Sequence, residues 1–162
     1  MRLPSFPPFD RYPPQFVSVN RHRTAYIRHG QGPPAVLLHG YAGAIWNWER
    51  QIEPLGERFT LFIPDVIGQG LSDKPRVAYR PAFYAGWLRG FLDAVGLARA
   101  PLVGHSMGAG LALGLALVAV NRDRVHVVAT QLLDEPIGSV FERREVADEF
   151  YRVTDWTPSE PR

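Results

Sequence analysis

The alternation of apolar and polar residues predicts strands and helices along most of the chain. Alternating side chains predict two opening strands, at residues 15–19 and 23–29, joined by a turn. A continuous apolar run at residues 35–38 indicates a strand covered on both faces. Buried strands are also predicted at 59–63 and 100–103, and a further strand at 124–133.

Apolar residues that recur every three or four positions predict helices between these strands. The clearest case is 81–96, where Phe83, Trp87, Phe91 and Val95 recur at four-residue intervals. The other predicted helices are 45–53 (ended by Pro54), 109–120 and 140–153. Strands that alternate with helices predict an α/β fold, with a mostly parallel sheet and helices on both faces.

Length and composition predict one globular domain, because 162 residues bury one core and leave no room for a second. We assign residues 1–162 to this domain, with a proline-rich extended arm at 1–14 and a divergent tail at 135–162. The 18 basic and 16 acidic residues give a net charge of +2, so no nucleic-acid partner is expected. The absence of cysteine excludes cysteine nucleophiles and thiolate metal sites.

The chain shows no pattern typical of a targeting or membrane segment. Prolines interrupt residues 1–8 before any apolar run begins, unlike a signal peptide. The longest apolar stretch, 111–120, is too short to cross a bilayer. We therefore expect a cytoplasmic location and no membrane partner.

The segment Gly104-His105-Ser106-Met107-Gly108 carries the strongest chemical signal. It fits a serine on a sharp turn between a strand and a helix, where the backbone is strained and the hydroxyl stands clear of the sheet. Glycines flank such a serine because a side chain there would collide with the neighbouring strand or helix. The motif therefore predicts a nucleophile at Ser106.

Three motifs in order make the chain resemble the α/β-hydrolase family over residues 15–134. Residues 37–41 (LLHGY) are similar to the family's oxyanion loop, residues 65–75 (DVIGQGLSDKP) to its conserved loop, and residues 104–108 to its nucleophile elbow. The resemblance implies an α/β-hydrolase-like core that lacks the family's last strands. It also implies that Asp65 and Asp73 anchor a loop.

The resemblance implies that Ser106 attacks a small-molecule ester and forms an acyl-enzyme. The backbone N–H groups of Tyr41 and Met107 would then bind the oxyanion. A serine at this position, where some relatives carry aspartate, argues against epoxide-hydrolase or dehalogenase chemistry. No cofactor and no metal are expected, because no histidine pair has the spacing of metal ligands.

The general base is not identified in the sequence. In this family the triad acid follows the serine and the histidine follows the acid. Here His126 is the only histidine after Ser106, and it lies near the start of its strand, at the end opposite the elbow. Asp134, at the end of that strand, is the candidate acid, whereas His39 is expected to order the oxyanion loop.

Three interpretations therefore stay open. The protein is a small serine esterase, an inactive hydrolase-fold domain that acts as a binding or assembly module, or the product of a gene that has been cut short. Without two further strands, residues 125–133 would form an exposed edge, which favours a homodimer through this strand and the C-terminal helix.

Four aromatic residues are candidates for either the core or the wall of an acyl site: Trp46, Trp48, Phe83 and Trp87.

Overall fold

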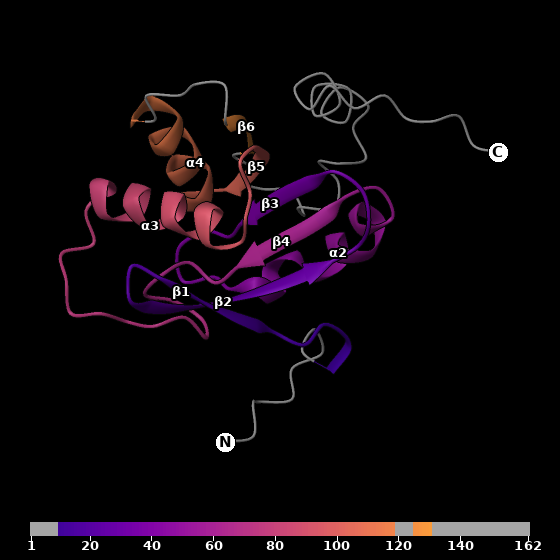
Figure 1. Ribbon diagram of the computed structural model, residues 1–162, viewed down its shortest axis with the longest axis horizontal. Coiled ribbons are helices and arrows are strands. Elements are labelled where there is room, and N and C mark those ends of the chain that lie inside the picture. The colour runs from indigo at the N-terminus through magenta and orange to yellow at the C-terminus, as the bar shows by residue number, and fades with distance from the viewer. Residues whose placement is uncertain (1–9, 119–124, 131–162) are drawn as a thin grey trace.

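The computed structural model describes residues 10–118 and 125–130, which form one mixed sheet between two layers of helices (Figure 1). The strands are β1 (Gln15–Val19), β2 (His22–His29), β3 (Pro34–Leu38), β4 (Thr60–Pro64), β5 (Ala100–His105) and β6 (Val125–Thr130). The helices are the 3-10 helix η1 (Ile45–Trp48), α2 (Glu49–Gly56), α3 (Pro81–Ala94) and α4 (Met107–Val118). The predicted α/β class is confirmed.

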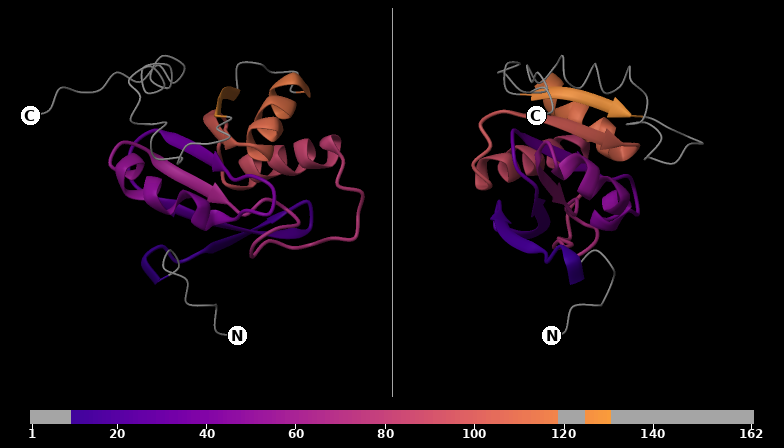
Figure 2. Two further views of the ribbon diagram at one scale, coloured as in Figure 1. Left: turned by 180° about the vertical axis from the view of Figure 1, so that it is seen from behind. Right: turned by 90° about the vertical axis from the view of Figure 1, so that its right-hand side faces the viewer.

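The strand order in the sheet is β1-β2-β4-β3-β5-β6. β4, β3, β5 and β6 are parallel, whereas β1 and β2 are antiparallel to their neighbours. Within the described residues β6 therefore lies at one edge of the sheet and β1 at the other (Figure 2). The carboxyl ends of β3, β4 and β5 meet at one end of the sheet, which is where ligand sites of such sheets lie.

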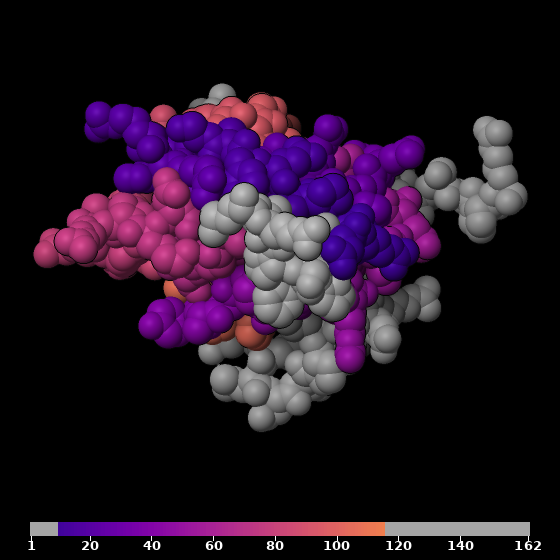
Figure 3. Space-filling view, turned by 90° about the horizontal axis from the view of Figure 1, so that it is seen from below, coloured from indigo at the N-terminus to yellow at the C-terminus, as the bar shows by residue number. Residues whose placement is uncertain are grey.

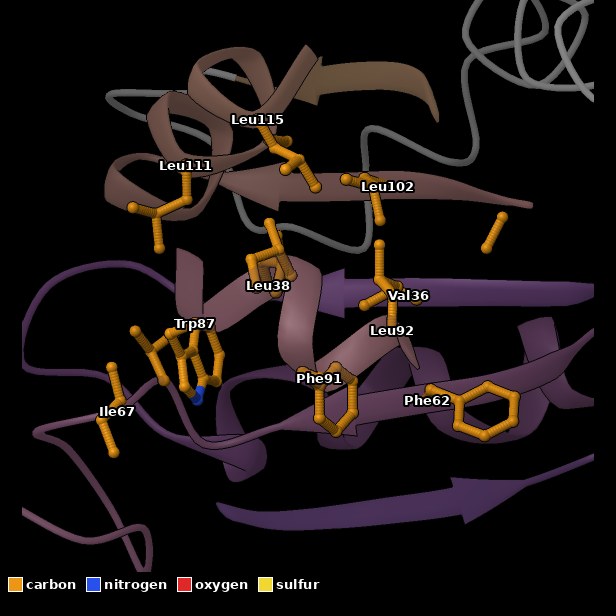
Figure 4. Packing of buried hydrophobic residues seen from close by; sticks show 14 of the residues in the cluster. Val36, Leu38, Phe62, Ile67, Trp87, Phe91, Leu92, Leu102, Leu111 and Leu115 are labelled. Carbon is orange, nitrogen blue, oxygen red and sulfur yellow. The ribbon is translucent and has the colours of Figure 1, made fainter. Parts of the chain in front are cut away.

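Alternate residues of each parallel strand pack on opposite faces of the sheet. Val36 and Leu38 of β3 face α3 and α4, in a cluster that includes Trp87 and Phe91 (Figure 4). Ala35 and Leu37 face η1 and α2, in a second cluster that includes Trp48. Trp48 and Trp87 are both buried. The structure therefore places these two tryptophans in the hydrophobic core and not in the wall of an acyl site.

The opening hairpin packs beside the loop that follows β4, and the two segments adjoin in the space-filling view (Figure 3). The backbone N–H of Arg23 donates to Asp73 Oδ2 at 2.7 Å, and that of Ala25 donates to Ser72 Oγ at 2.9 Å. These hydrogen bonds hold the loop against β2 at the carboxyl end of the sheet.

Most predicted elements differ from the observed ones by one to three residues at an end, and the predicted helix at 45–53 begins as the 3-10 helix η1. α2 continues through Pro54 to Gly56, and beyond the proline the Glu57 and Phe59 N–H groups still donate to the carbonyl oxygens of Glu53 and Leu55. The helix after the elbow begins at Met107, two residues earlier than predicted. The predicted helix at 140–153, the arm before residue 10 and the tail at 135–162 lie outside the described residues.

Candidate active site

Ser106 lies on a tight turn between β5 and α4. Its φ is +52°, in the left-handed region that costs a residue with a side chain about 1–3 kcal/mol. The Ser106 carbonyl accepts hydrogen bonds from the Ala109 and Gly110 N–H groups at 3.0 and 3.2 Å, which start the helix. The residue is exposed. The strained, exposed serine matches the elbow geometry that the sequence predicts.

The two elbow glycines are required by close backbone contacts. A Cβ atom on Gly104 would lie 2.3 Å from the backbone nitrogen of Ala109. A Cβ atom on Gly108 would lie 2.2 Å from the carbonyl oxygen of Leu38, at the end of β3. α4 therefore begins directly against β3, and any larger residue would push the elbow away from the sheet.

The loop after β3 lies against the serine. A Cβ atom on Gly40 would lie 3.3 Å from the Ser106 Cβ, so the two residues are nearly in contact. Tyr41 follows Gly40 with 81% of its surface exposed, and Ala42 has a φ of +55°. The fold thus brings the loop that carries Tyr41 next to Ser106, and Met107, the other predicted oxyanion donor, follows Ser106 in the chain. Their role in binding an oxyanion stays a prediction.

His39 is fully buried and holds this loop in place, as the sequence predicts. Its Nδ1 lies 2.8 Å from the Gly40 carbonyl oxygen, and its Nε2 lies 2.9 Å from the Val66 nitrogen. Because the Val66 N–H is a donor, Nε2 accepts, and Nδ1 carries the proton that it donates to Gly40. Burial lowers the pKa of His39, which keeps this neutral form. With both ring nitrogens engaged, His39 orders the loop and is not free to serve Ser106 as a base.

Asp65 anchors the loop after β4, also as predicted. Its two carboxylate oxygens accept hydrogen bonds from the Ile45 N–H at 2.8 Å and the Leu71 N–H at 2.6 Å. Its carbonyl oxygen accepts the Ser72 hydroxyl at 2.7 Å. A Cβ atom on Gly70 would lie 2.1 Å from the Asp65 carboxyl carbon, so the loop wraps tightly round the acid. Burial raises the pKa of Asp65 to about 6, although these N–H donors oppose the rise.

This raised pKa predicts a pH dependence of stability. The folded chain holds the Asp65 proton more tightly (pKa about 6) than a free carboxyl does (3.8). Asp65 therefore adds stability that is fully present below about pH 4 and is lost as the pH rises through 6, a change of roughly 3 kcal/mol. We expect the difference in free energy of unfolding between the wild type and Asp65→Asn to fall by this amount between pH 4 and pH 7.

Urea titrations of both proteins at the two pH values measure this difference. A difference that is constant across the range would show that folding does not shift the pKa of Asp65.

Gln69 is a site residue that the sequence did not reveal. Its Nε2 lies 3.9 Å from the Met107 sulfur, although the two residues are 38 positions apart. Its Oε1 is buried and has no hydrogen-bond partner among the described residues. Gln69 therefore places a carboxamide beside the residue that follows the nucleophile.

The structure does not join Ser106 to a base within the residues it describes. His126 pairs in register with Pro101, five positions before Ser106, which separates them by about 16 Å along the strands. A Cβ on Gly40 would lie 3.0 Å from His105 Nδ1, but no hydrogen bond links His105 to Ser106 in the described part. Asp134, the candidate acid, lies outside the described residues. Residues 10–118 and 125–130 also hold no cluster of three or more side chains that suits a metal ion.

None of the described helices is both long enough and apolar enough to cross a membrane.

A family model and the sequences of known proteins both match most of this chain. The family model for the alpha/beta hydrolase fold matches residues 33–149. An uncharacterized protein of Mycobacterium tuberculosis is 39% identical over 128 residues, which cover 78% of this chain and 38% of that protein. An epoxide hydrolase of Caballeronia sordidicola is 33% identical, over 88% of this chain and 45% of its own length.

Solved structures also match the fold. The crystal structure of a carboxylesterase from Bacillus subtilis superimposes with a TM-score of 0.68 and 26% identity, over 75% of this chain and 45% of that one. The chain thus spans less than half the length of these relatives. Since the family model matches residues 33–149, which are most of the chain, the chain belongs to the α/β hydrolase family.

Proposed function

We propose that the protein is a serine hydrolase that cleaves small carboxylic esters through an acyl-enzyme on Ser106. One observation carries this proposal: an exposed serine in the left-handed conformation, at the carboxyl end of the sheet, between two glycines that admit no side chain. A strained turn of this kind is retained where it serves a function.

In the proposed reaction, Ser106 Oγ attacks the ester carbonyl carbon as a base takes its proton. The carbonyl oxygen becomes an oxyanion, which the backbone N–H groups of Tyr41 and Met107 bind; one such donor contributes about 2.7–4 kcal/mol. The alcohol leaves with a proton, and water then hydrolyses the Ser106 ester to release the acid. Asp134 is proposed to orient the base, which the described residues do not supply.

The identity of the nucleophile favours acyl transfer over epoxide opening, the activity for which the Caballeronia sordidicola relative is named. A serine that opened an epoxide would form an ether, which water does not readily cleave. A serine that attacks an ester forms another ester, which water hydrolyses to complete the cycle. Ser106 therefore suits esters, in line with the carboxylesterase among the structural matches.

The proposal is tested by hydrolysis of p-nitrophenyl acetate and p-nitrophenyl butyrate. The proteins compared are the wild type, Ser106→Ala and the control Ser18→Ala, which removes an exposed hydroxyl from β1. We expect turnover by the wild type and by Ser18→Ala, and a fall to the uncatalysed rate in Ser106→Ala.

Equal rates in all three proteins would favour the second candidate function, an inactive hydrolase domain that binds a partner. The observation behind that candidate is the lack of a hydrogen bond between Ser106 and any histidine in the described part of the chain.

A further inference from the structure

His105 lies between the nucleophile elbow and the loop that follows β3. Leu38 of β3 pairs with Gly104 of β5. The loop that leaves β3 therefore begins beside His105, the last residue of β5. A Cβ atom on Gly40 would lie 3.0 Å from His105 Nδ1, 3.4 Å from the His105 carbonyl oxygen and 3.3 Å from the Ser106 Cβ. Gly40 therefore packs on the ring and backbone of His105 as well as on the nucleophile.

The ring of His105 is half-buried, and its contacts with the described residues are packing contacts. Among residues 10–118 and 125–130, no hydrogen bond or ion pair engages this ring. His39 differs, because both of its ring nitrogens have hydrogen-bond partners. Within this part of the chain, His105 therefore acts on its surroundings through the space that its ring fills.

The loop on the other side of this contact carries one of the predicted oxyanion donors. The Gly40 carbonyl oxygen accepts hydrogen bonds from His39 Nδ1 at 2.8 Å and from the Gly43 N–H at 3.1 Å. The Tyr41 N–H belongs to the same planar peptide group and points away from that carbonyl. The two hydrogen bonds therefore fix its direction, whereas its distance from Ser106 depends on how closely Gly40 approaches the elbow.

We propose that His105 is a positioning residue, whose ring fills the space between the elbow and Gly40 and thereby sets the distance between Ser106 and the Tyr41 N–H. This inference rests on the proposed function and adds a residue to its oxyanion site. A donor stabilises the oxyanion when it lies about 2.7–3.1 Å away. A misplacement of about 1 Å can slow a reaction roughly a hundredfold.

The test measures hydrolysis of p-nitrophenyl acetate by the wild type, His105→Ala and His105→Asn. We expect His105→Ala to lower kcat by about ten- to a hundredfold and to change KM by less than about threefold, because the oxyanion forms only in the transition state. The asparagine amide reaches nearly the place of Nδ1, so His105→Asn should recover most of kcat. Asparagine cannot take the Ser106 proton, so this recovery also distinguishes positioning from general-base catalysis.

The matched control is His22→Ala, which removes a half-buried histidine from β2, a strand that β4 and β3 separate from β5. This variant should keep the kcat and KM of the wild type. A wild-type kcat in His105→Ala, or a kcat in His105→Asn as low as that in His105→Ala, overturns the inference.

A double-mutant cycle separates this inference from the proposed function. Gly40→Ala places a Cβ atom against the His105 ring, so we expect it to lower the free energy of unfolding, and His105→Ala in the same chain should reduce that loss. Coupling of this kind supports the packing role of His105 even if no ester is hydrolysed. Losses that simply add overturn it. Turnover that depends on Ser106 but not on His105 keeps the hydrolase and overturns the inference.

Discussion

Replacing Gly108 with valine is expected to lower the free energy of unfolding by about 3 kcal/mol and to abolish any activity of Ser106. The new Cβ would lie 2.2 Å from the Leu38 carbonyl oxygen and 2.8 Å from that of His39. Both oxygens belong to backbone, and Leu38 is paired with Gly104 in the sheet, so neither can move without breaking the sheet. Overpacking of this kind costs about 1–3 kcal/mol even where side chains can adjust.

The matched control lies two residues along the same helix. A Cβ atom on Gly110 meets nothing within 4 Å, so Gly110→Ala should raise stability by about 0.5–1 kcal/mol through helix propensity. Urea denaturation of both variants measures the contrast. If Gly108→Val were as stable as the wild type, α4 could not begin against β3 as described.

Replacing Asp65 with alanine is expected to cost about 3 kcal/mol or more of stability. The substitution leaves the buried N–H groups of Ile45 and Leu71 without their acceptor, and each such group costs about 1–3 kcal/mol. The start of η1 and the loop after β4 would both lose their anchor. Because Gln69 and Gly68 belong to this loop, we also expect the residues around Ser106 to shift.

Asp73→Ala is the control for this prediction. Asp73 also accepts a backbone N–H, that of Arg23 at 2.7 Å, but its side chain is 43% exposed, so water can replace it. Its loss should cost about 1 kcal/mol. Equal losses in the two variants, measured by urea denaturation, would mean that burial of Asp65 does not decide its contribution.

The fold could be predicted because its signals are local and repeated. Apolar runs marked the strands, and the four-residue spacing of Phe83, Trp87 and Phe91 marked α3, whose buried face these residues share. The elbow could be predicted because crowding by β3 and α4 leaves room only for glycine at 104 and 108. The anchoring roles of Asp65 and His39 followed from the family motifs that contain them.

The rest of the site depends on contacts that no local pattern encodes. Gln69 reaches Met107 across 38 residues of sequence, because the loop after β4 meets the elbow at the end of the sheet. The aromatic residues offered as candidates for an acyl wall included Trp48 and Trp87, which prove to be core residues. An aromatic residue alone does not indicate whether it faces the core or the site.

The central claim is that the elbow makes Ser106 a reactive nucleophile, and covalent labelling tests it most directly. Incubation with diisopropyl fluorophosphate, which transfers its phosphoryl group to an activated serine with loss of fluoride, is followed by intact mass and peptide mapping. We expect one adduct per chain, on the peptide that contains Ser106, retained in Ser18→Ala and absent in Ser106→Ala. An unlabelled wild type, or labelling spread equally over other serines, would contradict it.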